Sequence, residues 1–352
     1  MSCSSIKKYK YEINTIINHK VHNLSNYYIL HDKRIALYED GLIKICNSKT
    51  YKPNIVIPIT DKNDYLNICE FIQNKKRNQF VFLVYSEKKN IIHLISLGKE
   101  NYTIIDTLKF ENKIYVYGIL NNIDYIDSFI VCLENSNELR IYKNKKNYFL
   151  FWNSSSYKID QIYKIEFIKN ASMTVKEIKE TQDGQNLILM STVVHSYITY
   201  YYFLNFNLVY KHIEAYYKLD EDWPSKNHFL ILQNKILFIN QLDDILLFNY
   251  NNMKDIYKEG KKNNDNNDKI ESIEKIDDNR IICGTNLGNV FEVEIKNGKF
   301  ISYDVLNITN RKKYKIFSNI NSIIKIEKNK YIIRDELCYL ICKRKYLMSD
   351  LK

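Results

Sequence analysis

The sequence has little glycine and proline, with 8 Gly and 3 Pro in 352 residues. This scarcity excludes collagen-like chains and chains made of flexible linkers. Hydrophobic residues make up 45% of the chain and aromatic residues 14%, which is too apolar for a disordered protein. A chain of this length can bury a sizeable core without disulfides or metals to hold it together.

Long apolar runs and an ordered cysteine pattern are also lacking. No run approaches the roughly 18 to 20 apolar residues that a membrane-spanning helix needs. The first residues are basic and contain no apolar stretch, so we expect no secretory signal. The seven cysteines are odd in number and form no C-x-x-C pair. We therefore expect no disulfide framework and a reducing compartment, the cytoplasm, with the nucleus as the alternative.

Basic residues exceed acidic ones, with 52 Lys and Arg against 41 Asp and Glu, so the formal net charge is +11. Lys, Asn, Ile and Tyr dominate the chain, while Ala, Gly, Pro and Arg are scarce. This composition is typical of AT-rich codons. It favours codon bias and a solvated surface as the source of the charge, and an anionic partner is the alternative explanation.

The chain contains a loose repeat of short β-forming runs separated by polar turns, while helix signals are weak. The clearest copy lies between residues 269 and 304, where four runs follow one another. Its last turn, Asn297-Gly298, suits a two-residue hairpin because both positions tolerate a positive φ. The repeat predicts a four-stranded antiparallel unit.

Seven such units can be marked along the chain, and together they predict one domain over residues 1–352. A spare strand at residues 8–17 is expected to complete the last unit, which has little room for a fourth strand of its own. Such pairing removes exposed strand edges. Residues 258–268 are of low complexity and are expected to form a loop. The predicted units cover residues 21–60, 65–110, 113–153, 170–217, 226–258, 268–305 and 319–345.

Two segments resemble the second and third strands of a repeat in the WD40 family: Arg280–Val293 (RIICGTNLGNVFEV) and Arg34–Cys46 (RIALYEDGLIKIC). The Gly-His and Trp-Asp dipeptides of that family are absent, so its buried Asp-His-Ser-Trp hydrogen-bond set is expected to be mostly missing. The resemblance implies an all-β fold, a seven-bladed β-propeller of four-stranded antiparallel blades. It also implies a rigid platform, usually non-catalytic, for assembling proteins.

Catalytic and metal-binding patterns are weak. His19 and His22 form an H-x-x-H without a second pair of ligands near them in sequence. There is no G-x-S-x-G motif, and Gly284–Gly288 lacks the Lys-Ser/Thr ending of a phosphate-binding loop. We therefore expect no enzymatic activity, no metal, no cofactor and no small-molecule substrate.

Candidate partner-binding residues are exposed aromatic and basic side chains in predicted loops. Trp223 lies in a polar loop, and tryptophan is enriched where partners bind most strongly. The turns between second and third strands are mostly acidic, whereas the segments that follow third strands are rich in lysine. The candidates are Trp223, Arg311, Lys312, Lys313, Lys143, Lys145, Lys146, Lys343, Arg344 and Lys345.

The leading functional hypothesis is a scaffold or adaptor that docks other proteins in a complex. The alternative is binding to RNA or a ribonucleoprotein through the basic loops, with steep salt dependence. Phosphoinositide binding is less favoured, because the chain has no Arg-Arg pair of the kind that autophagy-class propellers carry. Membrane insertion is not expected.

Overall fold

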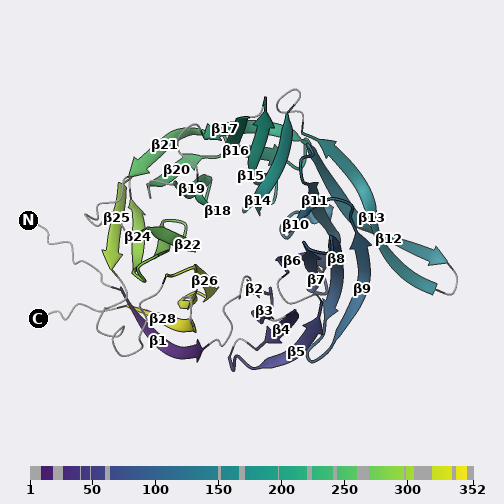
Figure 1. Ribbon diagram of the computed structural model, residues 1–352, viewed down its shortest axis with the longest axis horizontal. Helices are drawn as coiled ribbons and strands as arrows, with labels where there is room; N and C mark the ends of the chain where they lie inside the picture. The colour runs from purple at the N-terminus through teal and green to yellow at the C-terminus, as the bar shows by residue number, and fades with distance from the viewer. Residues whose placement is uncertain are drawn as a thin grey trace, which may run out of the picture. The chain divides into compact units, whose positions relative to one another are not determined.

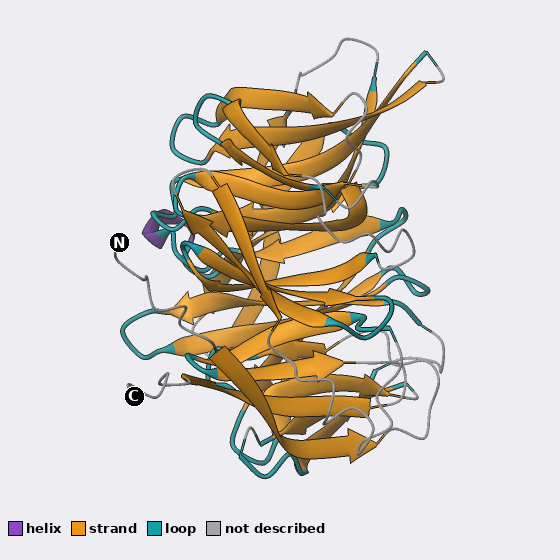
Figure 2. Ribbon diagram, turned by 90° about the vertical axis from the view of Figure 1, so that its left-hand side faces the viewer, coloured by secondary structure: helices purple, strands orange, loops and turns teal. Residues whose placement is uncertain are grey.

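The computed structural model describes residues 9–18, 27–39, 41–47, 49–59, 64–149, 152–165, 171–196, 198–219, 224–240, 244–259, 269–296, 299–304, 319–334 and 338–346. Strands make up nearly all of the regular structure of these residues, with one short 3₁₀ helix (Figure 2). The chain divides into two compact units, Asn23–Asp220 and Met1–His22 with Glu221–Lys352. We describe each unit by itself, so the single domain over residues 1–352 stays a prediction.

The unit Asn23–Asp220 contains four sheets, each of four antiparallel strands in chain order. The first sheet consists of β2 (Tyr27–Ile29), β3 (Ile35–Glu39), β4 (Leu42–Cys46) and β5 (Pro53–Pro58). The second consists of β6 (Leu66–Asn74), β7 (Gln79–Ser86), β8 (Ile91–Leu97) and β9 (Tyr102–Lys109). The third sheet consists of β10 (Ile114–Gly118), β11 (Ser128–Leu133), β12 (Glu138–Phe149) and β13 (Trp152–Lys164). The fourth consists of β14 (Ser172–Glu180), β15 (Asn186–His195), β16 (Ile198–Asn207) and β17 (His212–Leu219). The helix η1 (Ile123–Tyr125) follows β10.

The other unit contains three sheets of the same kind. The fifth sheet consists of β18 (Pro224–Leu232), β19 (Lys235–Asn240), β20 (Ile245–Asn249) and β21 (Lys254–Glu259). The sixth consists of β22 (Ile270–Asp277), β23 (Arg280–Thr285), β24 (Val290–Lys296) and β25 (Lys299–Asp304). The seventh sheet combines β26 (Ser322–Glu327), β27 (Lys330–Arg334) and β28 (Cys338–Tyr346) with β1 (Tyr9–Asn18) from the start of the chain.

The pairing of β1 with β28 confirms the prediction that an N-terminal strand completes the last sheet (Figure 1). The two strands are antiparallel, with Ile13 opposite Cys342 and Asn18 opposite Cys338. The predicted end of the third sheet at residue 153 is wrong, because β13 continues to Lys164. Of the predicted loop 258–268, Lys258 and Glu259 belong to β21, and the rest lies outside the described residues.

The apolar pattern of each strand reports its place in the sheet. Strand β5 alternates between exposed and buried positions through Ile55 and Ile57, as expected when one face packs on a core. Strand β15 is buried at every position from Asn186 to Val193, as expected for a strand packed on both faces. The cores lie between neighbouring sheets. One of them joins Phe71 and Leu83 of the second sheet to Phe129 of the third.

The second and third sheets approach each other most closely at Gly118, the last residue of β10. A Cβ at this position would lie 1.8 Å from the carbonyl oxygen of Glu70 in β6, which is backbone and cannot turn aside. By contrast, a Cβ at Gly98 would meet the side-chain oxygen of Asn101 at 2.0 Å. The side chain of Asn101 can rotate away, so the two glycines make a matched pair.

We expect Gly118→Ala to lower the free energy of unfolding by about 2 to 3 kcal/mol, because the added methyl group forces the two strands apart. Gly98→Ala should cost well under half of that amount. Urea unfolding of both variants measures the difference. Equal destabilisation by the two substitutions would contradict the close approach at Gly118.

Candidate interaction site

The third sheet carries an outer hairpin that is longer than the sheet itself. Strands β12 and β13 have 12 and 13 residues, whereas the matching strands β8 and β9 of the second sheet have 7 and 8. The last pair between β11 and β12 is Ser128 with Lys143. Beyond it, β12 pairs only with β13, from Asn144 opposite Tyr157 to Phe149 opposite Trp152. Residues 144–149 and 152–157, which we name the ribbon, therefore extend past β11 (Figure 1).

Tyr157 anchors the base of the ribbon to the second and third sheets. Its backbone N–H donates to Oδ2 of Asp106 in β9 at 2.9 Å, and its hydroxyl donates to Oδ1 of Asp127 at 2.5 Å. The ring is buried against Phe71 and Phe129, with centroids 5.6 and 5.8 Å away. Burial and the Asp127 carboxylate raise the pKa of the Tyr157 hydroxyl, so it stays protonated and remains a donor.

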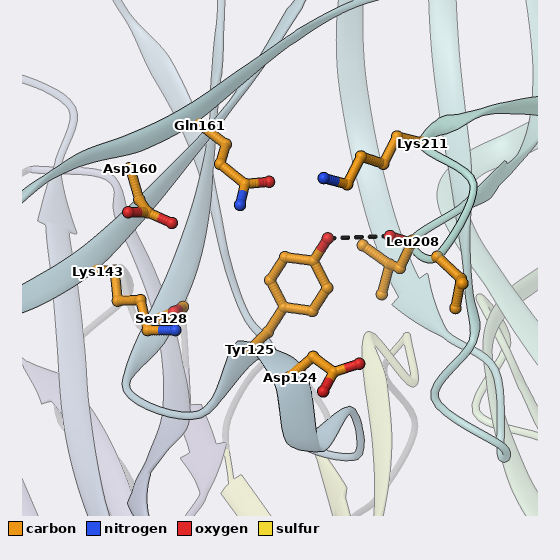
Figure 3. A pocket seen from close by; sticks show the side chains of 9 residues that line it. Asp124, Tyr125, Ser128, Lys143, Asp160, Gln161, Leu208 and Lys211 are labelled. Carbon is orange, nitrogen blue, oxygen red and sulfur yellow. Dashed lines mark hydrogen bonds between the residues drawn. The ribbon is translucent and has the colours of Figure 1, made fainter.

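A polar pocket of about 230 Å³ lies beside this hairpin, between the third and fourth sheets (Figure 3). Its lining comes from η1, from the facing ends of β11, β12 and β13, and from the turn between β16 and β17. The lining residues are Asp124, Tyr125, Ser128, Lys143, Asp160, Gln161, Leu208, Val209 and Lys211.

Tyr125 connects the two sheets across the floor of the pocket. Its hydroxyl donates to the carbonyl oxygen of Leu208 at 2.9 Å (Figure 3). The same hydroxyl lies 3.4 Å from the hydroxyl of Tyr163. Asn122 caps the helix that carries Tyr125, because its Oδ1 accepts from the N–H of Asp124 at 2.9 Å. The position of the Tyr125 ring is therefore fixed from both sheets.

Glu180, at the end of β14, holds the segment that leads into η1. Its carboxylate accepts backbone N–H groups from Leu120, Asn121 and Asn122 at 2.9 to 3.1 Å. Burial raises the pKa of Glu180 above its ordinary value of 4.5, although these hydrogen bonds oppose the rise. The carboxylate thus positions one wall of the pocket from the neighbouring sheet.

The pocket holds two cations and two anions that differ in their pairing. Asp160 Oδ1 lies 3.9 Å from the ammonium group of Lys145, a residue that does not line the pocket. Among the described residues, Lys143 and Lys211 form no ion pair. Lys211 lies over the ring of Tyr163, with Nζ 5.7 Å from the centroid. The site therefore offers free ammonium donors, one amide at Gln161 and two hydroxyls.

The structure separates the residues that the sequence suggested. Lys143 lines the pocket, Lys145 pairs with Asp160, and Lys146 lies in the ribbon with its side chain outside the description. Lys343 and Lys345 are exposed on β28. The remaining candidates other than Arg344 lie outside the described residues: Trp223, Arg311, Lys312 and Lys313.

Arg344 is buried, although it was expected to face a partner from a basic loop. It belongs to β28, and its guanidinium forms a bidentate pair with Glu292 of β24, with Nε–Oε1 at 2.5 Å and Nη2–Oε2 at 2.7 Å. The exposed fractions of the two side chains are 6% and 2%. Arg344 therefore joins the sixth and seventh sheets and is not presented to a partner.

The sequence analysis singled out only Lys143 of the lining residues and missed the others: Asp124, Tyr125, Ser128, Asp160, Gln161, Leu208, Val209 and Lys211. Their positions fall in three separate parts of the chain, and no spacing links them. A usable signal was the uncommon length between residues 138 and 164, which is now explained by the long hairpin.

A scan against protein-family models finds no match, and a search of curated proteins finds none either. Among solved structures, the chain is similar to the β-propeller domain of Cps50 (Swd1) from Myceliophteria thermophila, with a TM-score of 0.63 and 10% identity over 95% of this chain and 99% of that one. It is also similar to Raptor from Chaetomium thermophilum, with a TM-score of 0.66 and 11% identity over 97% of this chain and 30% of that one.

The likeness shows the fold. It is a seven-bladed β-propeller of four-stranded antiparallel blades, as the repeat and the WD40 resemblance predicted. Within the described residues, no three His, Cys, Asp or Glu side chains are grouped so that they could hold a metal ion. In the same part of the chain, no helix has the length and apolar character to cross a membrane.

We expect Arg344→Met or Glu292→Leu alone to lower the free energy of unfolding by about 3 to 5 kcal/mol, because each leaves an unpaired buried charge. The double variant should be more stable than either single variant, since it leaves no buried charge. A double-mutant cycle in urea measures both effects. Single substitutions that cost less than about 1 kcal/mol, as for an exposed pair, would contradict the buried pairing.

Glu180 should make stability depend on pH in a defined direction. Because its pKa is raised in the folded protein, the stability of the wild type relative to Glu180→Gln is fully present below about pH 4.5, its ordinary pKa, and is lost as the pH rises through the folded pKa. Urea unfolding of both proteins between pH 3.5 and 8 measures this difference. Glu111→Gln, in an exposed turn, serves as the control. A difference that grows with pH would contradict the assignment.

Proposed function

We propose that the chain is a non-catalytic platform that binds partner proteins and holds them together. The observation that carries this proposal is the ribbon, which extends beyond β11 and lies next to a polar pocket. A two-stranded ribbon is only marginally stable by itself in water. The chain retains and anchors one through Tyr157, although the sheet is complete without it.

The ribbon suits protein binding because of its backbone. The N–H of Asn144 still donates to the carbonyl oxygen of Asp127 at 3.2 Å. Beyond Asn144, the edge of β12 that faces away from β13 has no neighbouring strand among the described residues, so its N–H and C=O groups can pair with a strand from a partner. Lys145 and Lys146 lie on the same strand and add positive charge. Backbone pairing supplies affinity in such complexes, and the side chains supply selectivity.

The cysteines support a non-catalytic role and a reducing compartment, for which we propose the cytoplasm. Five of them are free and buried: Cys46, Cys69, Cys132, Cys283 and Cys342. Burial raises the pKa of the Cys69 thiol to about 12, so it is not a nucleophile at neutral pH. Such thiols act as small apolar side chains in the core.

Binding to RNA is the alternative hypothesis, and the comparisons give it no support. It rests on lysines such as Lys143, Lys145 and Lys146 alone. Protein partners held through backbone pairing should resist ribonuclease and moderate salt, whereas phosphate contacts weaken steeply as salt rises.

Shortening the ribbon tests the proposal. We replace residues 146–155 by Asn-Gly, which joins the opposed residues Lys145 and Ser156 through a two-residue turn and keeps Tyr157. We expect the melting temperature to change by less than about 4 °C, which corresponds to under 1 kcal/mol in a larger domain. Proteins that co-purify with the tagged wild type in its native host, after ribonuclease treatment, should be lost at least tenfold.

The control is Lys75→Ser with Lys76→Ser, in the exposed turn between β6 and β7, which removes charge without touching the ribbon. It should retain the same partners. Unchanged partners in the shortened variant would overturn the role of the ribbon. Loss of all wild-type partners on ribonuclease treatment would overturn the platform in favour of RNA.

A further inference from the structure

We propose that the pocket between the third and fourth sheets receives an acidic side chain, Asp or Glu, from a bound partner protein. This inference rests on the proposed function and names the chemistry by which a partner is recognised. It concerns residues from η1, β11, β12, β13 and the turn between β16 and β17, all of which are described.

The size of the pocket selects a single side chain. Pockets that enclose drug-sized ligands and cofactors have volumes of about 300 to 1,000 Å³. The pocket here has about 230 Å³, which leaves room for one side chain and the water around it. A partner would therefore insert one residue, while the rest of its segment stays on the surface.

The charges favour a carboxylate over a cation. Lys143 and Lys211 line the pocket without an ion pair among the described residues, so both ammonium groups can bind an anion. Asp160 already shares the charge of Lys145. Asp124 lies on the side of the Tyr125 ring away from Gln161 (Figure 3). An inserted cation would face the two free lysines, whereas an inserted carboxylate would be attracted by them.

The same charges favour a carboxylate over a phosphate. Because Asp160 already pairs with Lys145, the two lysines of the pocket are opposed by Asp124 alone, which leaves an excess of one positive charge. A phosphorylated residue carries about −1.5 to −2 charges near neutral pH and usually requires a cluster of Arg or Lys. A single negative charge is matched by what the pocket offers.

Hydrogen-bonding groups of the pocket would orient the inserted side chain. The amide of Gln161 and the ammonium group of Lys211 both extend into the space above Tyr125 (Figure 3). The Oε1 atom of Gln161 is buried without a hydrogen-bond partner among the described residues; as an acceptor it can bond a backbone N–H of the partner, not the carboxylate itself. The hydroxyl of Tyr125 donates to the carbonyl oxygen of Leu208, and that of Ser128 donates to the carbonyl oxygen of Ile126 at 3.4 Å. The amide N–H of Gln161 and the two lysines therefore remain as donors for a ligand.

Exposed apolar side chains stand next in sequence to residues that line the pocket. Ile123 is 63% exposed and precedes Asp124, while Val209 and Tyr210 are 53% and 72% exposed beside Lys211. Exposed apolar side chains around a polar centre are typical of protein-binding sites. We therefore expect apolar residues next to the acidic residue of the partner.

The test uses four immobilised peptide libraries of seven residues. The central residue is Glu, Gln, Lys or phosphoserine, and the flanking positions vary among Leu, Tyr, Ser and Gly in all four. Purified full-length protein should be retained at least tenfold more by the Glu library than by any other. The variant Lys143→Gln with Lys211→Gln should lose this preference, whereas Asp160→Asn should keep it.

Each other result overturns the inference. Stronger retention by the Lys library would assign the pocket to a cation, and stronger retention by phosphoserine would assign it to a dianion. Equal or negligible retention by all four libraries would leave the pocket without this role. Lys143 and Lys211 are also replaced singly and each variant is checked by its melting temperature, so that loss of folding is not mistaken for loss of binding.

The inference and the proposed function fail in different ways. If the wild type captures ribonuclease-resistant partners but shows no preference for Glu peptides, the pocket assignment is wrong and the platform stands. If the wild type prefers Glu peptides through Lys143 and Lys211 but captures no protein in its host, the platform is wrong and the pocket chemistry stands.

Discussion

The structure depends on polar contacts between neighbouring sheets. In each contact, a side chain on the first strand of one sheet bonds backbone groups at or just after the end of the first strand of the preceding sheet. In the unit Asn23–Asp220, Glu70 accepts the N–H of His31 at 2.7 Å, and Glu180 accepts N–H groups of residues 120–122. In the other unit the side chains are cationic donors instead of carboxylate acceptors: Lys275 and Lys325 donate to the carbonyl oxygens of Ile231 and Ile276. Strand ends leave such backbone groups unpaired, and an unpaired group costs free energy once buried.

These contacts also place the candidate site. Glu180 belongs to the fourth sheet, yet it fixes the three residues that lead into η1 of the third. Tyr125 then returns across the same boundary to the carbonyl oxygen of Leu208. The polar groups that hold the two sheets together, such as Glu180 and the Tyr125 hydroxyl, bond backbone groups across the boundary and do not use Lys143 or Lys211. If the pocket binds a partner as proposed, walls that are already held by hydrogen bonds reduce the ordering entropy lost on binding.

The sequence predicted the repeated sheets well, because a core on one face requires alternation and a core on both faces requires a continuous apolar run. It failed at the long hairpin, because the Lys, Asn and Ser residues of the ribbon have the composition of a loop. It failed at Arg344 for a related reason. The partner of Arg344, Glu292, lies 52 residues away, and nothing near Arg344 in sequence distinguishes it from the exposed Lys343 and Lys345. The pocket was missed because packing of two sheets brings its residues together.

The same contacts explain how the fold persists at 10% and 11% identity to its structural neighbours. A repeat with one shared hydrogen-bond set would preserve that set in every copy. Here the described boundaries use three kinds of contact: a carboxylate at Glu70 and Glu180, an ammonium group at Lys275 and Lys325, and a close backbone approach at Gly118. Each contact satisfies its own backbone groups without reference to the others. What the described sheets have in common is therefore a pattern of buried apolar positions, alternating or continuous, and such a pattern constrains residue class far more than residue identity.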